Sequence, residues 1–197
     1  EAYEGDVAMT CNNLGTLYSD INRMKEAEEY YQEALEIYRR LAKENPEAYE
    51  GDVAMTCNNL GTLYCNTNQM KEAEEYYQEA LEIYCRLAKE NPEAYEGDVA
   101  MICNNLGVLY RNTNRLKEAE AYYQEALEIR CMLAKINPEL YEGNVANTSY
   151  NLAFLHFDKG QKEKSKLYFE NALALYEKYP SCADKAQMVR DILSKYF

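Results

Sequence analysis

Few side chains in this sequence could carry out covalent chemistry. His156 is the only histidine in the 197 residues, and no Ser-His-Asp set accompanies it. Because general acid–base catalysis needs partners held at a fixed distance, we expect His156 to be a packing residue with one polar contact. No phosphate-binding loop or nucleotide-binding fingerprint occurs either. We therefore predict no catalytic residues and no enzymatic activity.

A run of glutamates in the first copy of a repeated segment resembles a carboxylate cluster that could transfer protons. Most of these glutamates lie beside an apolar stripe rather than within it, which is typical of a solvated outer helix face. Glu36 and Arg40 have the spacing of an ion pair along one helix. We therefore expect an exposed charged face, made by Glu26, Glu28, Glu29, Glu33 and Glu36.

The cysteines could in principle bind a metal or form disulfides. Cys11, Cys57 and Cys103 occupy one repeat position, and Cys85 and Cys131 share another. Equivalent positions on stacked helices lie about 10 Å apart, whereas a disulfide requires Cα atoms within about 7 Å. With no C-x-x-C motif and one histidine, the sequence predicts no metal site and no cofactor. Reduced thiols suit a cytoplasmic protein.

The residues with the clearest binding chemistry are asparagines that recur in the middle of a predicted helix. Asparagine is unfavourable there because its side chain competes for backbone hydrogen bonds. Its amide offers a donor and an acceptor together, which suits a peptide backbone. Helices stacked about 10 Å apart match about three residues of extended chain. The candidate residues are Asn12, Asn13, Asn58, Asn59, Asn104, Asn105 and Asn151.

Two interpretations of the asparagines remain open. They could contact a bound peptide, with Asn13, Asn59, Asn105 and Asn151 forming the ladder. Alternatively, they could hydrogen-bond between neighbouring repeats, or simply persist after a recent duplication.

Apolar side chains near the asparagines could determine which ligand binds. Methionines lie one turn before them, and methionine adapts to varied apolar ligands, although it also fills cores. In the last copy three aromatic residues could form a pocket that holds one partner side chain, unless a tail helix covers them. These candidates are Met9, Met55, Met101, Tyr150, Phe154 and Phe157.

The elements that must position these side chains repeat every 46 residues. The second copy differs from the first at five positions, and the third differs from the second at nine. A fixed period of this size indicates a solenoid, in which each unit contacts only its neighbours. We expect a single repeat domain over 1–197, with repeats at 1–46, 47–92, 93–138 and 139–180 and a capping helix within 181–197.

Each copy predicts two helices, at about residues 6–19 and 24–44 in the first. Asn22 recurs in the turn and becomes Gly160 in the last copy, which indicates a left-handed backbone position. Pro46 stops the second helix, and 47–51 should be a loop or a single turn. Ser181 should cap a final helix over about 182–196.

Recurring small and large positions resemble those of the tetratricopeptide repeat family. In the first copy they are Leu14, Gly15, Tyr18, Ala27, Tyr31 and Ala34. The second and third copies repeat all six. Residues 11–18 also resemble the helix motif of kinesin light chains, whose repeats are longer than the usual 34 residues. The resemblance implies an all-α, right-handed superhelical solenoid whose first helices line a concave face, and it implies peptide binding by the asparagines.

The net charge is −13, and the successive copies contribute −5, −6, −2 and 0. An acidic surface repels phosphate backbones, so we expect no nucleic-acid partner. No apolar stretch of membrane-spanning length and no signal peptide are visible, so we expect no membrane partner.

These features predict a protein-interaction scaffold that binds a partner peptide in its concave groove. An architectural or regulatory arm of a larger signalling or enzyme chain, without its own ligand groove, is the alternative. No cap precedes the first repeat, so self-association through that face is a third possibility.

Overall fold

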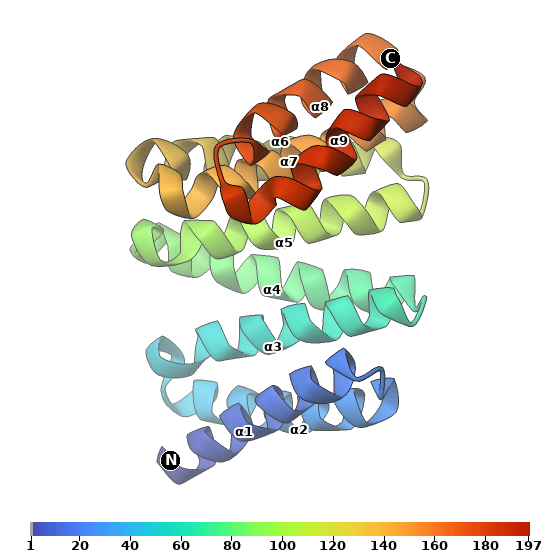
Figure 1. Cartoon of the computed structure of the whole chain (residues 1–197). Helices are drawn as coiled ribbons and strands as arrows, with labels where there is room; N and C mark the ends of the chain where they lie inside the picture. Colours follow the sequence, from blue (N-terminus) through green and yellow to red (C-terminus); the bar gives the residue numbers. More distant parts are fainter. Residues whose placement is uncertain (1) are drawn as a thin grey trace. The chain divides into compact units, whose positions relative to one another are not determined.

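The computed structural model describes residues 2–197, and every element within that range is helical (Figure 1). The described chain forms two compact units that divide after Asn105, here called unit 1 and unit 2. The elements are α1 (Ala2–Asp20), α2 (Met24–Glu44), α3 (Pro46–Asn66), α4 (Met70–Glu90), α5 (Pro92–Asn112), α6 (Leu116–Ile136), α7 (Pro138–Asp158), α8 (Lys162–Tyr176), the 3₁₀ turn η1 (Pro180–Cys182) and α9 (Ala183–Tyr196).

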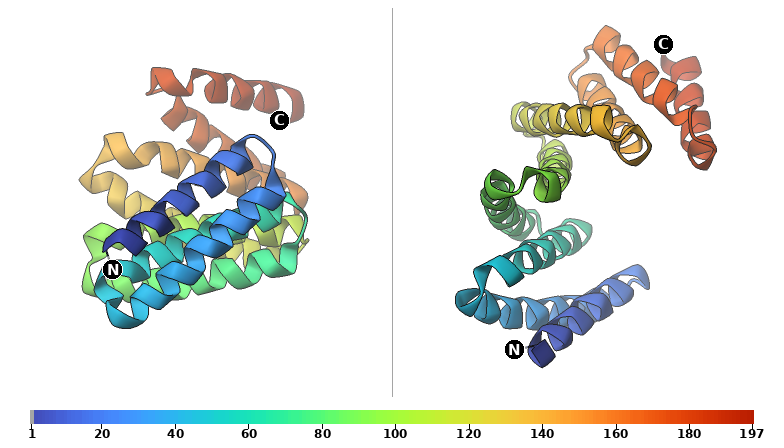
Figure 2. Two further views of the ribbon diagram at one scale, coloured as in Figure 1. Left: turned by 90° about the horizontal axis from the view of Figure 1, so that it is seen from below. Right: turned by 90° about the vertical axis from the view of Figure 1, so that its left-hand side faces the viewer.

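Within each unit, successive helices pack against each other as pairs, as the sequence predicts. In unit 1, α1 packs on α2, α3 packs on α4, and α2 packs on α3 (Figure 2). In unit 2, α7 packs on α6 and α8, and α9 packs on α8. The structure thus confirms an all-α repeat fold, while the right-handed turn of the solenoid stays a prediction.

A residue with a left-handed backbone conformation follows the first helix of each repeat. Asn22, Asn68 and Asn114 have φ angles of 61°, 62° and 60°, and Gly160 has a φ of 70°. The amide of Arg23 donates to the carbonyl oxygen of Tyr18 at 2.8 Å, which satisfies a carbonyl at the helix end. The exchange of asparagine for glycine is therefore explained by backbone conformation, as predicted.

The expected loop at 47–51 is wrong, because α3 begins directly at Pro46. The amide of Ala48 donates to the Asn45 side chain at 3.3 Å, so Asn45 caps the helix. Proline fits the first helical position because its missing N–H would have no partner there. Each Asn-Pro pair therefore ends one helix and starts the next.

Close packing within a pair depends on one glycine. A Cβ atom on Gly61 would lie 2.6 Å from the ring of Tyr77, closer than any real contact. Ala73 and Ala80 on either side of Tyr77 are fully buried. The alternation of small and large side chains that suggested the family is therefore the interlock between α3 and α4.

The end of the chain has the predicted capping helix with a different start. The N-cap of α9 is Cys182 without a side-chain hydrogen bond, and Ser181 lies inside η1. Ala186 and Val189 of α9 are buried against Phe169 and Ala172 of α8. The helix therefore forms through this apolar packing rather than through a serine cap.

None of the described helices has both the length and the apolar character needed to cross a membrane.

Candidate functional site

The asparagines of unit 1 form hydrogen bonds from one repeat to the next. The Asn59 amide nitrogen donates to Asn12 Oδ1 at 3.2 Å, and the Asn105 amide nitrogen donates to Asn58 Oδ1 at 2.9 Å. Asn12 is 5% exposed and Asn58 is 9% exposed. The accepting asparagines, Asn12 and Asn58, therefore lie buried in the seam between repeats. Asn12 belongs to that seam and not to an open face.

The donating asparagines, Asn59 and Asn105, keep polar atoms that a ligand could bind. Asn59 and Asn105 are half-buried, and each uses one amide N–H in the seam. Their amide oxygens have no partner in the part of the chain that the structure describes. A peptide N–H could donate to such an oxygen. Asn13, at the equivalent position in α1, is exposed.

The remaining candidate asparagines, one outside the predicted ladder and one within it, are half-buried. Asn104 lies beside Asn105 on α5, and Asn151 lies on α7 in unit 2. Both have polar or electrostatic interactions of their own.

A pocket of about 540 Å³ opens beside Asn58 and Asn59. Its lining comes from α3 and α5, together with Tyr84 of α4. Met55 and Met101, both half-buried, lie in its wall, whereas Met9 of α1 is exposed and does not belong to this lining. The lining residues are Glu47, Ala48, Gly51, Asp52, Met55, Asn58, Asn59, Tyr84, Tyr95, Asp98 and Met101. We call this the α3–α5 pocket.

The α3–α5 pocket is acidic. Glu47, Asp52 and Asp98 line it, and no lining residue carries a positive charge. Partial burial raises the pKa values of Asp52 and Asp98 because it penalises the ionised carboxylate. Burial also raises the pKa of Tyr84, and the two carboxylates add to that shift. A cation placed here would relieve unfavourable charge.

The sequence prediction missed these carboxylates. Asp52, Met55 and Asn59 follow one another at i, i+3 and i+7, which places all three on one helix face. The same spacing joins Asp98, Met101 and Asn105. That spacing was the signal that could have identified the aspartates.

The predicted aromatic pocket of the last copy is filled by the chain itself. Tyr150 and Phe154 make edge contacts to each other and to Phe169, with ring centroids 4.9 to 5.8 Å apart. The Tyr150 hydroxyl donates to the sulfur of Met188 on α9 at 3.2 Å. Of the two interpretations of these rings, the one with a covering tail helix matches the structure.

Phe157 lies at the edge of this cluster and is partly exposed. Its ring packs edge-on against Tyr196 and Phe197, with centroids 5.6 and 6.2 Å away. The end of the chain thus occupies the surface next to it.

His156 is a buried packing residue with polar contacts. Its Nδ1 lies 2.7 Å from Gln161 Oε1, and its ring stacks on Tyr168 with centroids 5.2 Å apart. Its Nε2 is 3.9 Å from Glu120, whose carboxylate pairs with Lys159. The carboxylate nearest to His156 is thus already engaged in an ion pair.

Thiols and metal-binding side chains form no further site in the described residues. Cys11, Cys57 and Cys103 are buried, and burial raises the pKa of Cys57 to about 12. No group of His, Cys, Asp and Glu side chains within residues 2–197 is arranged to hold a metal ion.

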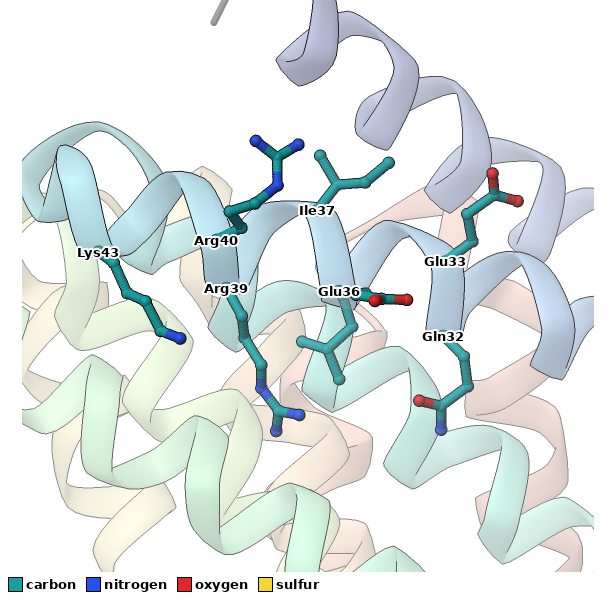
Figure 3. Close-up of a pocket in the computed structure, with 8 residues that line it drawn as sticks. Gln32, Glu33, Glu36, Ile37, Arg39, Arg40 and Lys43 are labelled. Atoms are coloured by element: carbon teal, nitrogen blue, oxygen red, sulfur yellow. The ribbon is translucent and has the colours of Figure 1, made fainter.

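A larger hollow of about 870 Å³ lies along α2, away from the asparagines (Figure 3). Gln32 and Arg39 extend from one side of the helix and Arg40 from the other (Figure 3). Arg39 pairs with Glu79 at 2.6 Å, and Arg40 pairs with Glu4 at 2.9 Å. Both arginines of this hollow are therefore already paired with carboxylates on other helices of unit 1.

Known proteins share this arrangement of helices. Models of the tetratricopeptide repeat match residues 7–47, 52–132 and 146–179, which together make up most of the chain. The structure of BtubC (BKLC) from P. vanneervenii is 28% identical, with a TM-score of 0.68 over 96% of this chain and 65% of that one. No curated protein matches the sequence.

Two further structures share the fold at lower identity. RapI in its apo form is 17% identical, with a TM-score of 0.76 over 98% of this chain and 49% of that one. Aspartyl phosphate phosphatase F from Bacillus subtilis is 16% identical, with a TM-score of 0.76 over 96% and 46%. The chain thus spans 65% or less of each of these three proteins.

Proposed function

Because the chain belongs to the tetratricopeptide repeat family, a family of protein-interaction modules, we propose that it binds an extended peptide segment of a partner protein. The peptide lies on the face of unit 1 that carries Asn59, Asn105 and the α3–α5 pocket. Asn58 lines the same pocket, and Asn13 continues the face on α1. The proposal places the protein in the cytoplasm and gives it no catalytic role.

One observation carries this proposal. Asn59 and Asn105 are each held in place by a seam bond, and each keeps an amide oxygen without a partner in the described residues; Asn59 also lines the open pocket. An amide that is fixed before binding loses little rotational freedom when a peptide arrives. The half-buried Met55 and Met101 supply adaptable apolar contact at the same place.

The spacing of the asparagines supports an extended ligand. Asn59 and Asn105 sit on successive first helices, and such helices pack about 10 Å apart. An extended chain covers that distance with about three residues, so amides on successive repeats could each meet a backbone group. A compact helical ligand would not match this spacing as simply.

Self-association is a second candidate because α1 exposes apolar side chains. Leu17 is 53% exposed, whereas Leu63 at the equivalent position of α3 is 2% exposed. Tyr3 and Ile21 are exposed on the same helix. An interaction through this end would also suit an architectural arm. Sedimentation at two concentrations measures it, and a constant mass would exclude it.

The seam bond provides a matched test of the peptide site. Asn59→Ala and Asn12→Ala remove the same hydrogen bond, but only Asn59 lines the pocket. Both should lower the free energy of unfolding by about 1 kcal/mol. Only Asn59→Ala should also weaken binding of a peptide selected from a displayed random library, by about tenfold.

Equal stability losses with unequal binding losses would support the proposal. If both variants bind the selected peptide as well as the wild-type protein does, the asparagines serve the seam alone. A library that yields no binder to the wild-type protein would overturn peptide binding altogether.

A further inference from the structure

We infer that the α3–α5 pocket receives a lysine or arginine side chain, so that the partner segment is a basic extended peptide. This inference rests on the proposed function, because it names the chemistry of the ligand at the same site. It concerns Glu47, Asp52 and Asp98, which the asparagine ladder does not use.

The carboxylates of the pocket lack the partners that nearby acids have. Glu50, also on α3, pairs with Arg86 of α4, and Glu4 of α1 pairs with Arg40 of α2. Asp52 and Asp98 are half-buried, but neither has a salt bridge within the described residues. Leaving partly buried carboxylates unpaired is unfavourable, and a bound cation would remove that penalty.

The remaining lining suits the long stem of a basic side chain. Met55, Met101 and Tyr95 offer apolar surface on which the methylene groups of lysine or arginine can lie. Asn58 is more than nine-tenths buried and lines the pocket. Its oxygen accepts from Asn105, while its amide N–H groups have no protein partner in the described chain. A peptide carbonyl could accept from them.

The charge of unit 1 favours the same partner at longer range. Residues 1–105 carry 22 acidic and 8 basic side chains, a net charge of −14. Residues 106–197 carry 12 acidic and 13 basic side chains, a net charge of +1. The field of unit 1 would therefore attract a cationic segment and repel an acidic one, with a strong dependence on salt.

The test begins with the same displayed library of random short peptides. Binders of the wild-type protein should be enriched in lysine and arginine next to apolar residues. The strongest binder is then synthesised together with a version in which every basic residue is replaced by glutamine. The glutamine version should bind about tenfold more weakly at physiological salt, and the difference should shrink as salt rises.

Paired variants locate the effect on the protein. Asp52→Asn with Asp98→Asn should weaken the basic peptide about tenfold and leave the glutamine peptide unchanged. Asp6→Asn with Asp20→Asn changes the net charge by the same amount at exposed positions outside the pocket, and Asp6 is the equivalent of Asp52 in the first repeat. This control pair should have a much smaller effect.

The two proposals fail in different ways. Binders without basic enrichment that still depend on Asn59 would overturn the basic partner and leave peptide binding standing. Equal losses from the two aspartate pairs would show a general charge effect and overturn the pocket assignment. A library that yields no binder overturns both proposals.

Discussion

Units 1 and 2 are built from related repeats, but the exposed faces of those repeats differ. In unit 1, the first helices α3 and α5 carry amides, methionines and unpaired carboxylates around an open pocket. In unit 2, α7 carries Tyr150 at the position equivalent to Asn58 and Phe154 at the position equivalent to Thr62, and both rings pack against Phe169 in the cluster that α9 completes. The near-identical copies keep a face open, whereas the diverged copy closes it with aromatic rings.

This difference shows where binding chemistry can reside in a repeat protein. Side chains of the fourth repeat bury an apolar face against α9 and are therefore committed to packing. An internal repeat already has neighbours on both sides, and its remaining face is free to vary.

The largest expected effect concerns the aromatic cluster of unit 2. Phe169→Ala should lower the free energy of unfolding by about 3–5 kcal/mol, because Phe169 is fully buried among Ala153, Tyr150 and Val189. Urea unfolding followed by circular dichroism measures the change. Leu167→Ala, at an exposed position of the same helix, should change stability by less than about 0.5 kcal/mol. Similar effects of the two would show that the cluster is not a core.

A smaller effect should distinguish two helix glycines. Gly61→Ala should destabilise the protein by about 1–3 kcal/mol, because the new methyl group would meet the Tyr77 ring at 2.6 Å. Gly143→Ala in α7 has nothing within 4 Å of its added Cβ and should stabilise by up to about 1 kcal/mol through helix propensity. Thermal melts of the two variants give the comparison. A stabilising Gly61→Ala would contradict the tight interlock of α3 with α4.

The smallest effects are those of single carboxylates, and their signs should be opposite in the two units. Burial raises the pKa of Asp52, so protonation of this side chain stabilises the folded protein. That stabilisation is present at low pH and is lost as the pH rises through the pKa of Asp52 in the folded state. Asp52→Asn should therefore stabilise the protein at neutral pH, by less than about 1 kcal/mol after solvent screening. The gain should disappear below the ordinary aspartate pKa of about 3.9.

Glu120 in unit 2 provides the opposite case. The hydrogen bond from Lys159 lowers its pKa, so its contribution is present above the ordinary carboxyl value and is lost as pH falls through the folded pKa. Glu120→Gln should destabilise at neutral pH by less than about 1 kcal/mol. Urea titrations at several pH values measure both variants. Equal signs at neutral pH would contradict the assignment of Asp52 to an unpaired, ligand-ready pocket.

The repeat fold was predictable because its signals are local and recur. The exchange of Asn114 for Gly160 indicated a left-handed turn, and the alternation around Tyr77 indicated the family. The start of α3 was missed because Pro46 was interpreted only as the end of α2. Proline also suits the first turn of a helix, and Asn45 before it is a good cap.

The site was only partly predictable. The sequence identified the asparagines but could not separate Asn12 from Asn59, because their bond joins residues 47 positions apart. It also left open whether α9 covers Tyr150, since packing of a tail helix depends on contacts far apart along the chain. The repeated spacing of Asp52 and Met55 was visible, but it acquires meaning only when α3 and α5 form one pocket.

The most direct measurement follows the side-chain amide signals of asparagine by NMR while the selected peptide is added. We expect the signals of Asn59 and Asn105 to shift in proportion to bound peptide, with little change at Asn147 of α7, which lies outside the α3–α5 pocket. Saturable binding that leaves Asn59 and Asn105 unmoved, or that instead shifts resonances of α9, would contradict a peptide site on the open face of unit 1.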